Sequence, residues 1–482
     1  MPAASTWSTD RSIATPPARF IRADRVERDA SPLNDTLYEA RVLDAYTIGV
    51  QAYVYGWPAV HNWRIRSCLL DPDFPQHAPL GTFLHEPVPA DHRYRLFVTP
   101  NADLLYSEAF CDLRGEPTVL HVPDTGGMRY WAAQILDGFT DTAANISSRS
   151  AGNGPGDYAL VGPGWDGELP PGVTEVRVPT RTCFILLRTL FETEADLPAT
   201  RKIQQGFTLT PLTHYLAGTT YAPAAIPAAD PRRDVPRDEA ELSTSLAYFT
   251  VLNHALTEGG MRPDENGLRH LFARIGVGPG LDFAPDTLDS ATREGLTRAL
   301  ADGWKLVQAR SATARTTFRN GWVLPDPIAQ TGSYGHDHLQ RAGVAHRGIY
   351  ANTAEEYAAL PAVLDSAGRP LDGDATYTIH MEADQLPKVD SYWSITLYTL
   401  PDRALPDHPS GRTTVNSLQP DLTYAPDGSL DIHIQADDPG PGRRANWLPS
   451  VPGPFQLILR AYGPTDPAIH RGEWPAPAIE RS

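Results

Sequence analysis

The fold is decided by TYTIHMEA (376–383), SYWSITLYTL (391–400), SLDIHIQA (429–436) and FQLILRAY (455–462). Apolar and polar residues alternate in each of these segments, which is typical of β-strands with one buried face. Turn residues such as Asp427-Gly428 and Pro452-Gly453-Pro454 separate the later segments. Short alternating segments divided by turns favour an antiparallel β domain, which we place at residues 335–482.

A similar group of segments lies upstream. They are rich in β-branched and aromatic residues and recur about every ten residues, with Pro, Gly, Asn and Asp between them. These segments are RYRLFVT (93–99), LLYSEAFCDL (104–113), TVLHV (118–122), RYWAAQIL (129–136), DYALVG (157–162), TEVRV (174–178) and CFILLRTLF (183–191). We expect them to form an antiparallel sandwich or barrel within an N-terminal domain at residues 34–193.

Helical patterns occupy the rest of the chain. A helix is expected at 34–57, ending at Trp57-Pro58 because proline disfavours the α-region in the preceding residue. Its proposed apolar face carries Ala40, Leu43, Thr47, Val50 and Val54. Residues 194–334 are predicted to be mainly helical with a Pro/Ala-rich linker at 219–236, and residues 1–33 to be a disordered lead-in.

Composition excludes several classes of protein. The chain has 482 residues and a formal net charge of -17, so it lacks the basic surface of a nucleic-acid-binding protein. Its 46 prolines and 38 glycines indicate a chain that turns often. No apolar run reaches the roughly 18–20 residues of a membrane span. Three cysteines form no disulfide framework. The polar N-terminus lacks the apolar core of a secretory signal, so we expect a cytoplasmic protein.

No familiar catalytic fingerprint is present. The sequence has no GxxxxGK[ST] loop, no GxGxxG after a strand, no HExxH and no GxSxG elbow. These absences count against P-loop, Rossmann and α/β-hydrolase chemistry. We therefore predict no cofactor.

The turn in VTPNADLLYSEAF (98–110) is the first candidate site, because turns at the ends of rigid strands often display catalytic side chains. Asp103 and Tyr106 are catalytic candidates there, and Asn101 is a substrate-binding candidate. The alternative is that Asn101 and Asp103 cap local backbone amides.

RYWAAQILDGFTD (129–141) supplies a similar strand end. Asp137 is expected to form an acid/base pair with Asp103. Tyr130 and Gln134 are substrate-binding candidates. Arg149 is a candidate anion clamp, with a surface arginine on a Gly-rich loop as the alternative.

Alternation also defines a polar face in the C-terminal domain. If its four strands are neighbours, one face gathers polar side chains that form either the floor of a cleft or a solvated outer surface. These side chains are His380, Tyr398, Asp431, His433, Gln435 and Arg460. No metal site is predicted; His380 and His433 are only a weak metal-ligand alternative.

Several longer stretches together resemble a two-domain bacterial family built from domains of unknown function 1254 and 1214. The N-terminal match rests on TPNADLLYS (99–107), RYWAAQILDGFTD (129–141), GDYALVGPGW (156–165) and VPTRTCFILLRTL (178–190). The C-terminal match rests on RAGVAHRGIYANTAEEY (341–357), GRPLDGDATYTIHME (368–382), SYWSITLYTLPDRAL (391–405), DGSLDIHIQADDPG (427–440), ANWLPSVPGPFQLILRAYGP (445–464) and EWPAPAIE (473–480). The resemblance implies a mainly β fold of two β-sandwich, jelly-roll-like domains joined by helices, and it implies no particular reaction.

The residues and the resemblance together lead us to expect an enzyme of hydrolase or lyase type that acts on a small organic or sugar-like substrate. Its pocket would lie at the turn ends of the first β domain, with Trp393 and Asn446 approaching from the second. The expected partner is a small-molecule substrate, with no nucleic acid and no membrane, and a homo-oligomer is compatible with these features. The alternatives are a non-catalytic ligand-binding or oligomer-forming jelly-roll protein and a metal-dependent enzyme that uses the strand histidines.

Overall fold

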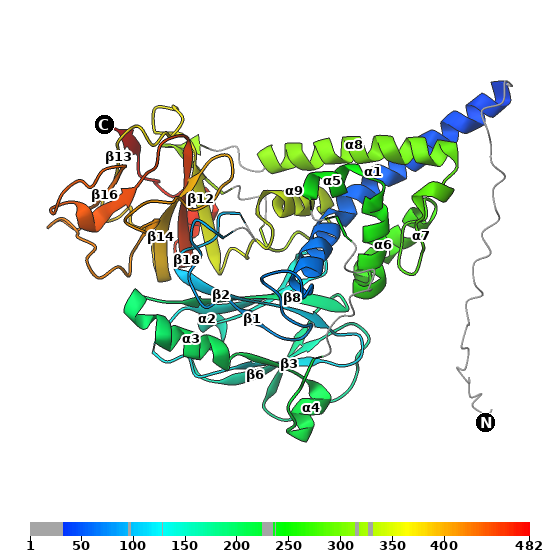
Figure 1. Ribbon diagram of the computed structural model, residues 1–482, viewed down its shortest axis with the longest axis horizontal. Coiled ribbons are helices and arrows are strands. Elements are labelled where there is room, and N and C mark those ends of the chain that lie inside the picture. Colours follow the sequence, from blue (N-terminus) through cyan, green and yellow to red (C-terminus); the bar gives the residue numbers. More distant parts are fainter. Residues whose placement is uncertain are drawn as a thin grey trace, which may run out of the picture.

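The computed structural model describes residues 32–482 except 95–97, 128, 224–234, 237, 314–317 and 326–330. Figure 1 shows an N-terminal β domain, a C-terminal β domain and a helical part that lies above the first and beside the second. Three predicted segments lie mostly or partly outside the described residues. They are the lead-in at 1–33, the linker at 219–236 and the centre of the strand at 93–99.

The N-terminal β domain contains two facing sheets. The five-stranded sheet has the order β1-β2-β8-β4-β5 and the four-stranded sheet the order β7-β6-β3-β9. Pairing is antiparallel except between β6 and β7. The strands are β1 (Leu84–His85), β2 (Leu104–Asp112), β3 (Thr118–Val122), β4 (Trp131–Asp137), β5 (Thr142–Ser147), β6 (Gly156–Val161), β7 (Val173–Arg177), β8 (Thr182–Leu190) and β9 (Thr208–Pro211).

Alternation along β2 and β8 determines what each face contacts. Ala109 and Cys111 of β2 and Leu187 of β8 point into the core between the two sheets. Phe110 and Phe184 point the other way, toward the helix α1 (Pro32–Leu69) and Tyr350. The outer face of the five-stranded sheet is therefore covered rather than solvated.

The C-terminal β domain is also a pair of sheets. A six-stranded sheet has the order β10-β11-β12-β18-β14-β15, and a four-stranded sheet has the order β17-β16-β13-β19. Only β16 and β17 pair in parallel among the described strands of these sheets. The strands are β10 (Phe318–Arg319), β11 (Trp322–Val323), β12 (Tyr357–Ala362), β13 (Tyr377–Met381), β14 (Val389–Thr399), β15 (Thr414–Asn416), β16 (Leu430–Gln435), β17 (Trp447–Pro449), β18 (Phe455–Pro464) and β19 (Ile479–Arg481). The mainly β, two-domain prediction is confirmed by this architecture.

The four C-terminal strands are not all neighbours in one sheet, so the condition for a single polar face is not met. β13 and β16 belong to one sheet, whereas β14 and β18 belong to the other. Their apolar faces meet in a shared core that includes Ile379, Ile395 and Ile432. Their polar faces consequently point in opposite directions, because each sheet turns its polar face away from the common core.

The helical part packs around its own apolar core. The α-helices outside the β sheets are α1, α2 (Ser148–Ala151), α3 (Leu197–Gly206), α4 (Leu212–Ala217), α5 (Glu239–Thr244), α6 (Ala247–Gly259), α7 (Asn266–Ala273), α8 (Ser290–Thr313), α9 (His338–Gly348) and α10 (Pro467–His470). Short 3-10 turns precede α3, α7, α8 and β17, at Glu194–Asp196, Pro263–Glu265, Pro285–Thr287 and Arg444–Asn446. None of the described helices combines the length and the apolar character needed to cross a membrane.

The first helix corrects two sequence predictions. α1 continues through Pro58 to Leu69, where the sequence predicted an end at 57. Proline removes one backbone hydrogen bond, but tertiary packing on the buried second half of the helix compensates for that loss. The predicted apolar face is also wrong, because Leu43 is 59% exposed and the buried face carries Val42, Ala45 and Ile48.

Glycines allow α1 and α8 to approach closely. A Cβ at Gly295 of α8 would lie 2.5 Å from the carbonyl oxygen of Val42, and one at Gly303 would lie 2.5 Å from the Tyr53 ring. On α1, a Cβ at Gly49 would meet the side chains of Ala299 and Leu296 at 2.8 Å. At Gly295 the backbone of α8 therefore lies against the backbone of α1, whereas Gly303 and Gly49 make room for side chains of the opposite helix.

Candidate anion-binding site between the two β domains

The site is built where a turn of the N-terminal domain meets the outer face of the six-stranded sheet. Nδ2 of Asn101 donates to the hydroxyl of Tyr462 at 2.7 Å and to that of Tyr392 at 3.2 Å. The Tyr398 hydroxyl donates to the carbonyl oxygen of Pro100 at 2.6 Å, and Nη2 of Arg460 donates to that of Thr99 at 2.8 Å. The polar face of β14 and β18 thus holds residues 99–101 in place.

A cavity of about 260 Å³ lies beside this contact. Its walls come from the outer face of β2 and β8, the C-terminal end of α9 with the residues after it, and β12 and β18. The lining contains four arginines, Arg188, Arg347, Arg403 and Arg460, and no aspartate or glutamate. The described walls of the cavity therefore carry positive charge with no lining carboxylate to balance it.

Arg460 is the most buried of these arginines, at 4% exposure. Nη2 donates to Thr99, whereas Nη1 is buried with no hydrogen-bond partner among the described residues. Its guanidinium also lies over the ring of Tyr398, 5.4 Å from the centroid. An N–H group of a buried cation without an acceptor is costly, and an anion in the cavity would supply one.

The other arginines are held by polar contacts that orient them. Nη1 of Arg188 donates to Oε1 of Gln134 at 2.9 Å, and Nη1 of Arg403 donates to the carbonyl oxygen of Arg347 at 2.6 Å. Burial lowers the pKa of Arg403 from its ordinary value, and the charge of Glu239 opposes that shift.

Tyrosines form the rest of the polar lining. The hydroxyl of Tyr106 accepts a hydrogen bond from the backbone N–H of Asn101 at 3.1 Å, which leaves its own proton available for donation. Burial raises the pKa of Tyr106, so the phenol is neutral at physiological pH. The rings of Tyr357 and Tyr462 pack at 5.1 Å between centroids and provide an aromatic wall.

Glu108 lies on β2 beside residues that line the cavity, although it is not itself a lining residue. It shares the outer face of that strand with Tyr106 and pairs across the ladder with Leu186, and both of these neighbours line the cavity. Its side chain is buried, and neither carboxyl oxygen has a hydrogen-bond partner among the described residues. Burial, reinforced by the charge of Glu86, raises the pKa of Glu108 well above its usual range. The charge of Arg188 opposes this shift.

The structure brings Asn101, Asp103 and Tyr106 together at the domain contact. Oδ1 of Asp103 accepts a hydrogen bond from Nδ2 of Asn416 at 2.8 Å, and its backbone N–H donates to Oδ1 of Asn101 at 2.6 Å. Burial raises the pKa of Asp103, against the opposing effect of the Asn416 hydrogen bond. Asp103 is not among the residues that line the cavity.

The expected acid/base pair of Asp103 and Asp137 is not formed. Asp103 lies beside Phe191, whereas Asp137 pairs with Cys183 near the other end of β8. Eight residues of extended chain separate those two positions, roughly 26 Å at about 3.3 Å per residue. The two carboxylates belong to different sites.

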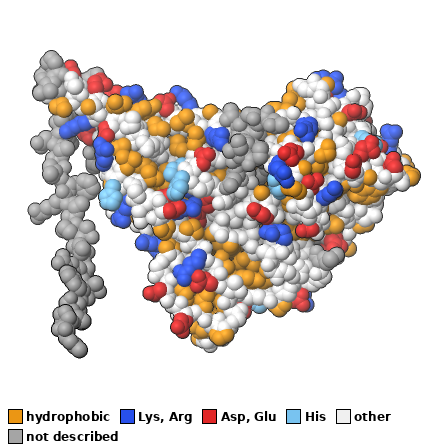
Figure 2. Space-filling view, turned by 180° about the vertical axis from the view of Figure 1, so that it is seen from behind, with side chains coloured by type: hydrophobic (Ala, Val, Ile, Leu, Met, Phe, Trp, Pro, Cys, Tyr) orange, Lys and Arg blue, Asp and Glu red, His pale blue; other side chains and the backbone are white. Residues whose placement is uncertain are grey.

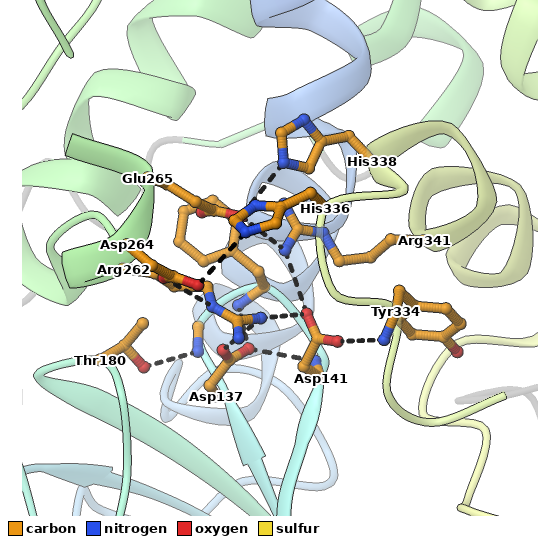
Figure 3. Close-up of polar contacts among 12 residues, drawn as sticks. Asp137, Asp141, Thr180, Arg262, Asp264, Glu265, Tyr334, His336, His338 and Arg341 are labelled. Atoms are coloured by element: carbon orange, nitrogen blue, oxygen red, sulfur yellow. Dashed lines mark hydrogen bonds and ion pairs between the residues drawn. The ribbon is translucent and has the colours of Figure 1, made fainter. Parts of the chain in front are cut away.

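Asp137 instead organises a turn below the helices, as Figure 3 shows. Its Oδ1 accepts hydrogen bonds from the backbone N–H groups of Phe139 and Asp141, at 2.8 and 3.0 Å. Nη1 of Arg262 lies 3.7 Å from Oδ2. Burial and the neighbouring Asp141 raise the pKa of Asp137 to about 7, while Arg262 and Arg341 oppose that shift.

Gln134 acts behind the cavity rather than in it. Its Oε1 positions Arg188, and its Nε2 donates to the Thr142 hydroxyl at 2.9 Å and the carbonyl oxygen of Ala351 at 3.1 Å. Tyr130 is buried against the rings of Tyr392 and Tyr462.

The anion clamp expected at Arg149 is not available. Nε of Arg149 donates to Oε2 of the buried Glu356 at 2.9 Å, so its charge is already compensated inside the protein. The contact ties the end of β5 to the start of β12. Arg149 therefore forms an ion pair with Glu356 and does not line the cavity.

The two residues expected from the second domain have structural positions. Trp393 lies in the core between the C-terminal sheets, because it sits on the apolar face of β14. Asn446 caps a loop: its Oδ1 accepts from the backbone N–H of Thr423 at 2.9 Å, and its Nδ2 donates to the carbonyl oxygen of Thr423 at 2.6 Å. Neither residue lines the cavity.

The strand histidines do not form a metal site together. Nδ1 of His380 lies 2.6 Å from Oδ1 of Asp431 on the exposed face of β13 and β16. His433 pairs with Thr378 in the ladder, next to the pair formed by Ile432 and Ile379. This face is the solvated sheet surface that the sequence offered as an alternative. The face that carries Tyr398 and Arg460 is instead buried against the N-terminal domain.

Four residues of the site were not identified from the sequence: Arg188, Glu108, Arg347 and Arg403. The sequence does contain an indication for Arg188 and Glu108, because each is a charged residue within a mostly apolar, buried strand. Arg347 and Arg403 lie at the end of a helix and in a turn, where an arginine is ordinary.

Comparisons with known proteins agree with this architecture. Residues 80–211 match the family model "Protein of unknown function (DUF1254)", and residues 356–466 match "Protein of unknown function (DUF1214)". The crystal structure of the VPA0106 protein from Vibrio parahaemolyticus is 23% identical, with a TM-score of 0.70 over 91% of this chain and 100% of that chain, which shows a shared fold.

A crystal structure of an uncharacterized protein from Burkholderia cenocepacia is 14% identical, with a TM-score of 0.44 over 93% of this chain and 98% of that one. No curated protein matches the sequence. The resemblance noted from the sequence motifs is confirmed by the two family models, which lie in the expected order. The chain belongs to the two-domain family in which a DUF1254 domain precedes a DUF1214 domain.

Proposed function

We propose that the protein binds a small organic anion, with one or two carboxylate or phosphate groups, in the cavity between the two β domains. The observation that carries this proposal is the arginine-rich lining without a carboxylate, and within it the buried Nη1 of Arg460 that has no acceptor. Guanidinium groups bind carboxylates and phosphates through strong, directional hydrogen bonds. A bound anion would give the buried Nη1 of Arg460 an acceptor.

The rest of the lining indicates the body of the ligand. Apolar side chains from three segments, Leu186, Ile349 and Ile458, share the walls with the tyrosine rings. A volume of about 260 Å³ is at the lower end of the range for small-molecule sites. These features favour a compact organic acid or phosphate ester over a polymer or a bare inorganic ion.

A second candidate function is catalysis on this anion, for which Glu108 is the supporting observation. A carboxyl held neutral by burial can donate a proton to a leaving group or to a developing oxyanion. Tyr106 offers a second neutral donor beside it. We propose hydrolysis or elimination with Glu108 as the general acid. In this assignment Asp103 stabilises the domain contact and does not take part in the chemistry.

Ligand screening tests both candidates. The purified chain would be screened by thermal shift and calorimetry against small carboxylates and phosphate esters, with uncharged amides and alcohols of the same size as controls. We expect saturable binding of one or more anions at a stoichiometry of one per chain. Equal responses to the uncharged analogues would contradict the anion proposal.

Glu108→Gln separates binding from catalysis. Glutamine reproduces the shape of a neutral carboxyl but cannot transfer a proton, so the variant should retain binding and lose turnover of any substrate found. Full turnover by Glu108→Gln would reject the catalytic candidate and leave the binding proposal intact.

A further inference from the structure

A second cluster of polar side chains lies in the helical part, on the side of the N-terminal sheet where Asp137 is found (Figure 3). Glu265 ends the 3-10 turn Pro263–Glu265 that precedes α7. His336 and His338 flank Asp337, whose side chain caps the start of α9 by accepting a hydrogen bond from the backbone N–H of Gln340. The cap fixes the first turn of α9 and therefore places His338 next to Glu265.

The donor atoms of these residues are close together. One ligand atom from each of Glu265, His336 and His338 lies within 4.8 Å of the others. Nε2 of His338 is 3.1 Å from Oε1 of Glu265, and Nε2 of His336 is 3.8 Å from Oδ2 of Asp264. Two atoms that each lie about 2.0–2.2 Å from a tetrahedral Zn²⁺ ion are themselves about 3.3–3.6 Å apart, which is close to these separations.

The burial of Glu265 also points to a cation, independently of the spacing of the donor atoms. Its side chain is 1% exposed, so a carboxylate has been removed from water at this position. Its Oε2 is buried without a hydrogen bond of normal geometry, although the Tyr55 hydroxyl comes near the carboxylate. A buried carboxylate oxygen in this condition is stabilised by a cation.

The neighbouring arginines do not fully supply that cation. Arg341 lies 3.1 Å from Asp141 and 3.4 Å from Glu265, while Arg262 lies 2.8 Å from Asp141 and 3.7 Å from Asp264. Both guanidinium groups are closer to Asp141 than to the other carboxylates. Glu265 and Asp264 are thus only partly compensated, and the exposed side chain of His336 provides an opening to solvent.

We propose that Glu265, His336 and His338 bind a divalent transition-metal ion, most suitably Zn²⁺, with Asp264 or water as a further ligand. Two imidazoles and one carboxylate form a common ligand set for this ion. The ion would join the turn before α7 to the start of α9. Because the other end of α9 lines the anion cavity, the metal would stabilise one wall of that cavity without entering it. This inference does not depend on the proposed function.

The test uses the full chain, stripped of metal with a chelator and titrated with ZnCl₂ by calorimetry. We expect one Zn²⁺ per chain, a raised melting temperature in its presence, and the tetrahedral visible spectrum when Co²⁺ replaces it. His336→Ala should weaken Zn²⁺ binding about tenfold or more and abolish the Co²⁺ spectrum. His270→Ala, an exposed histidine on α7, is the matched control and should bind as the wild type does.

His338→Ala tests the second imidazole. If that variant fails to fold, His336→Ala still tests the proposal, because the side chain of His336 is mainly exposed and its loss should not affect folding. Absence of stoichiometric Zn²⁺ binding to the wild-type chain would overturn the proposal. Zn²⁺ binding of unchanged affinity in His336→Ala would overturn it as well.

Discussion

Nη2 of Arg460 lies 2.8 Å from the carbonyl oxygen of Thr99, while Nη1 of the same guanidinium has no hydrogen-bond partner among the described residues. One side of this side chain therefore joins β18 to the N-terminal turn, and the other side has no acceptor. The arrangement makes the cavity, and with it the proposed anion site, a product of the contact between the two β domains.

Arg460→Gln should weaken binding of a cavity anion by roughly 10- to 100-fold, which is the effect of losing about 1.5–3 kcal/mol from hydrogen bonds to a charged group. Calorimetry with any anion found in the screen measures it. Arg177→Gln is the matched control, because Arg177 lies on the exposed strand β7 and pairs with Glu175. Equal losses in both variants would mean that net charge, and not the site, governs binding.

Asn101→Ala should destabilise the protein by about 1–3 kcal/mol, because it leaves buried tyrosine hydroxyls without their donor. Denaturant unfolding measures the loss. A double-mutant cycle with Tyr462→Phe should give a coupling energy of about 0.5 kcal/mol or more, since the two side chains share a hydrogen bond. Additive effects would show that the 2.7 Å contact contributes little to the stability of the domain interface.

Gly295→Ala should destabilise the protein, although alanine is the better helix former by about 1 kcal/mol. The new Cβ would lie 2.5 Å from the carbonyl oxygen of Val42 and would force α8 away from α1. Gly267→Ala on α7 is the control, because a Cβ there meets no atom within 4 Å. We expect a lower melting temperature for the first variant and an unchanged or higher one for the second; the reverse order would refute close helix packing at Gly295.

Asp196 should contribute a pH-dependent part of the stability. The bidentate hydrogen bonds from Arg129, at 2.6 and 2.8 Å, lower the pKa of this half-buried carboxyl to about 2 from its ordinary 3.8. A depressed pKa means that the contribution is present above about pH 4 and is lost as the pH falls toward 2. Asp196→Asn should therefore cost about 2 kcal/mol at pH 7 and less at pH 3. A cost that does not change with pH would contradict the ion-pair account.

Many strand positions in both β domains follow closely from the sequence. The segments 118–122 and 183–191 correspond to β3 and β8 within a residue, because runs of β-branched, aromatic and other apolar residues bounded by turn residues favour buried strands. Strand 142–147 has no such pattern and was not predicted: its side chains are mostly half-buried between the sheet edge and the rest of the chain.

The site was less predictable than the strands for a geometric reason. Local alternation identifies the two faces of a strand but not the sheet to which the strand belongs, so the polar face carrying Arg460 was grouped with that of His380. Arg188 of β8 and Arg460 of β18 line one cavity only because the two domains dock. A single sequence contains no local record of that docking.

Soaking crystals in bromide tests the central claim most directly, because an anomalous signal locates an anion without knowledge of the natural ligand. We predict a bromide peak in the interdomain cavity, within hydrogen-bond distance of Nη1 of Arg460, and its loss in Arg460→Gln. Bromide peaks confined to the outer surface, with the cavity empty in the wild-type protein, would contradict the assignment of an anion site.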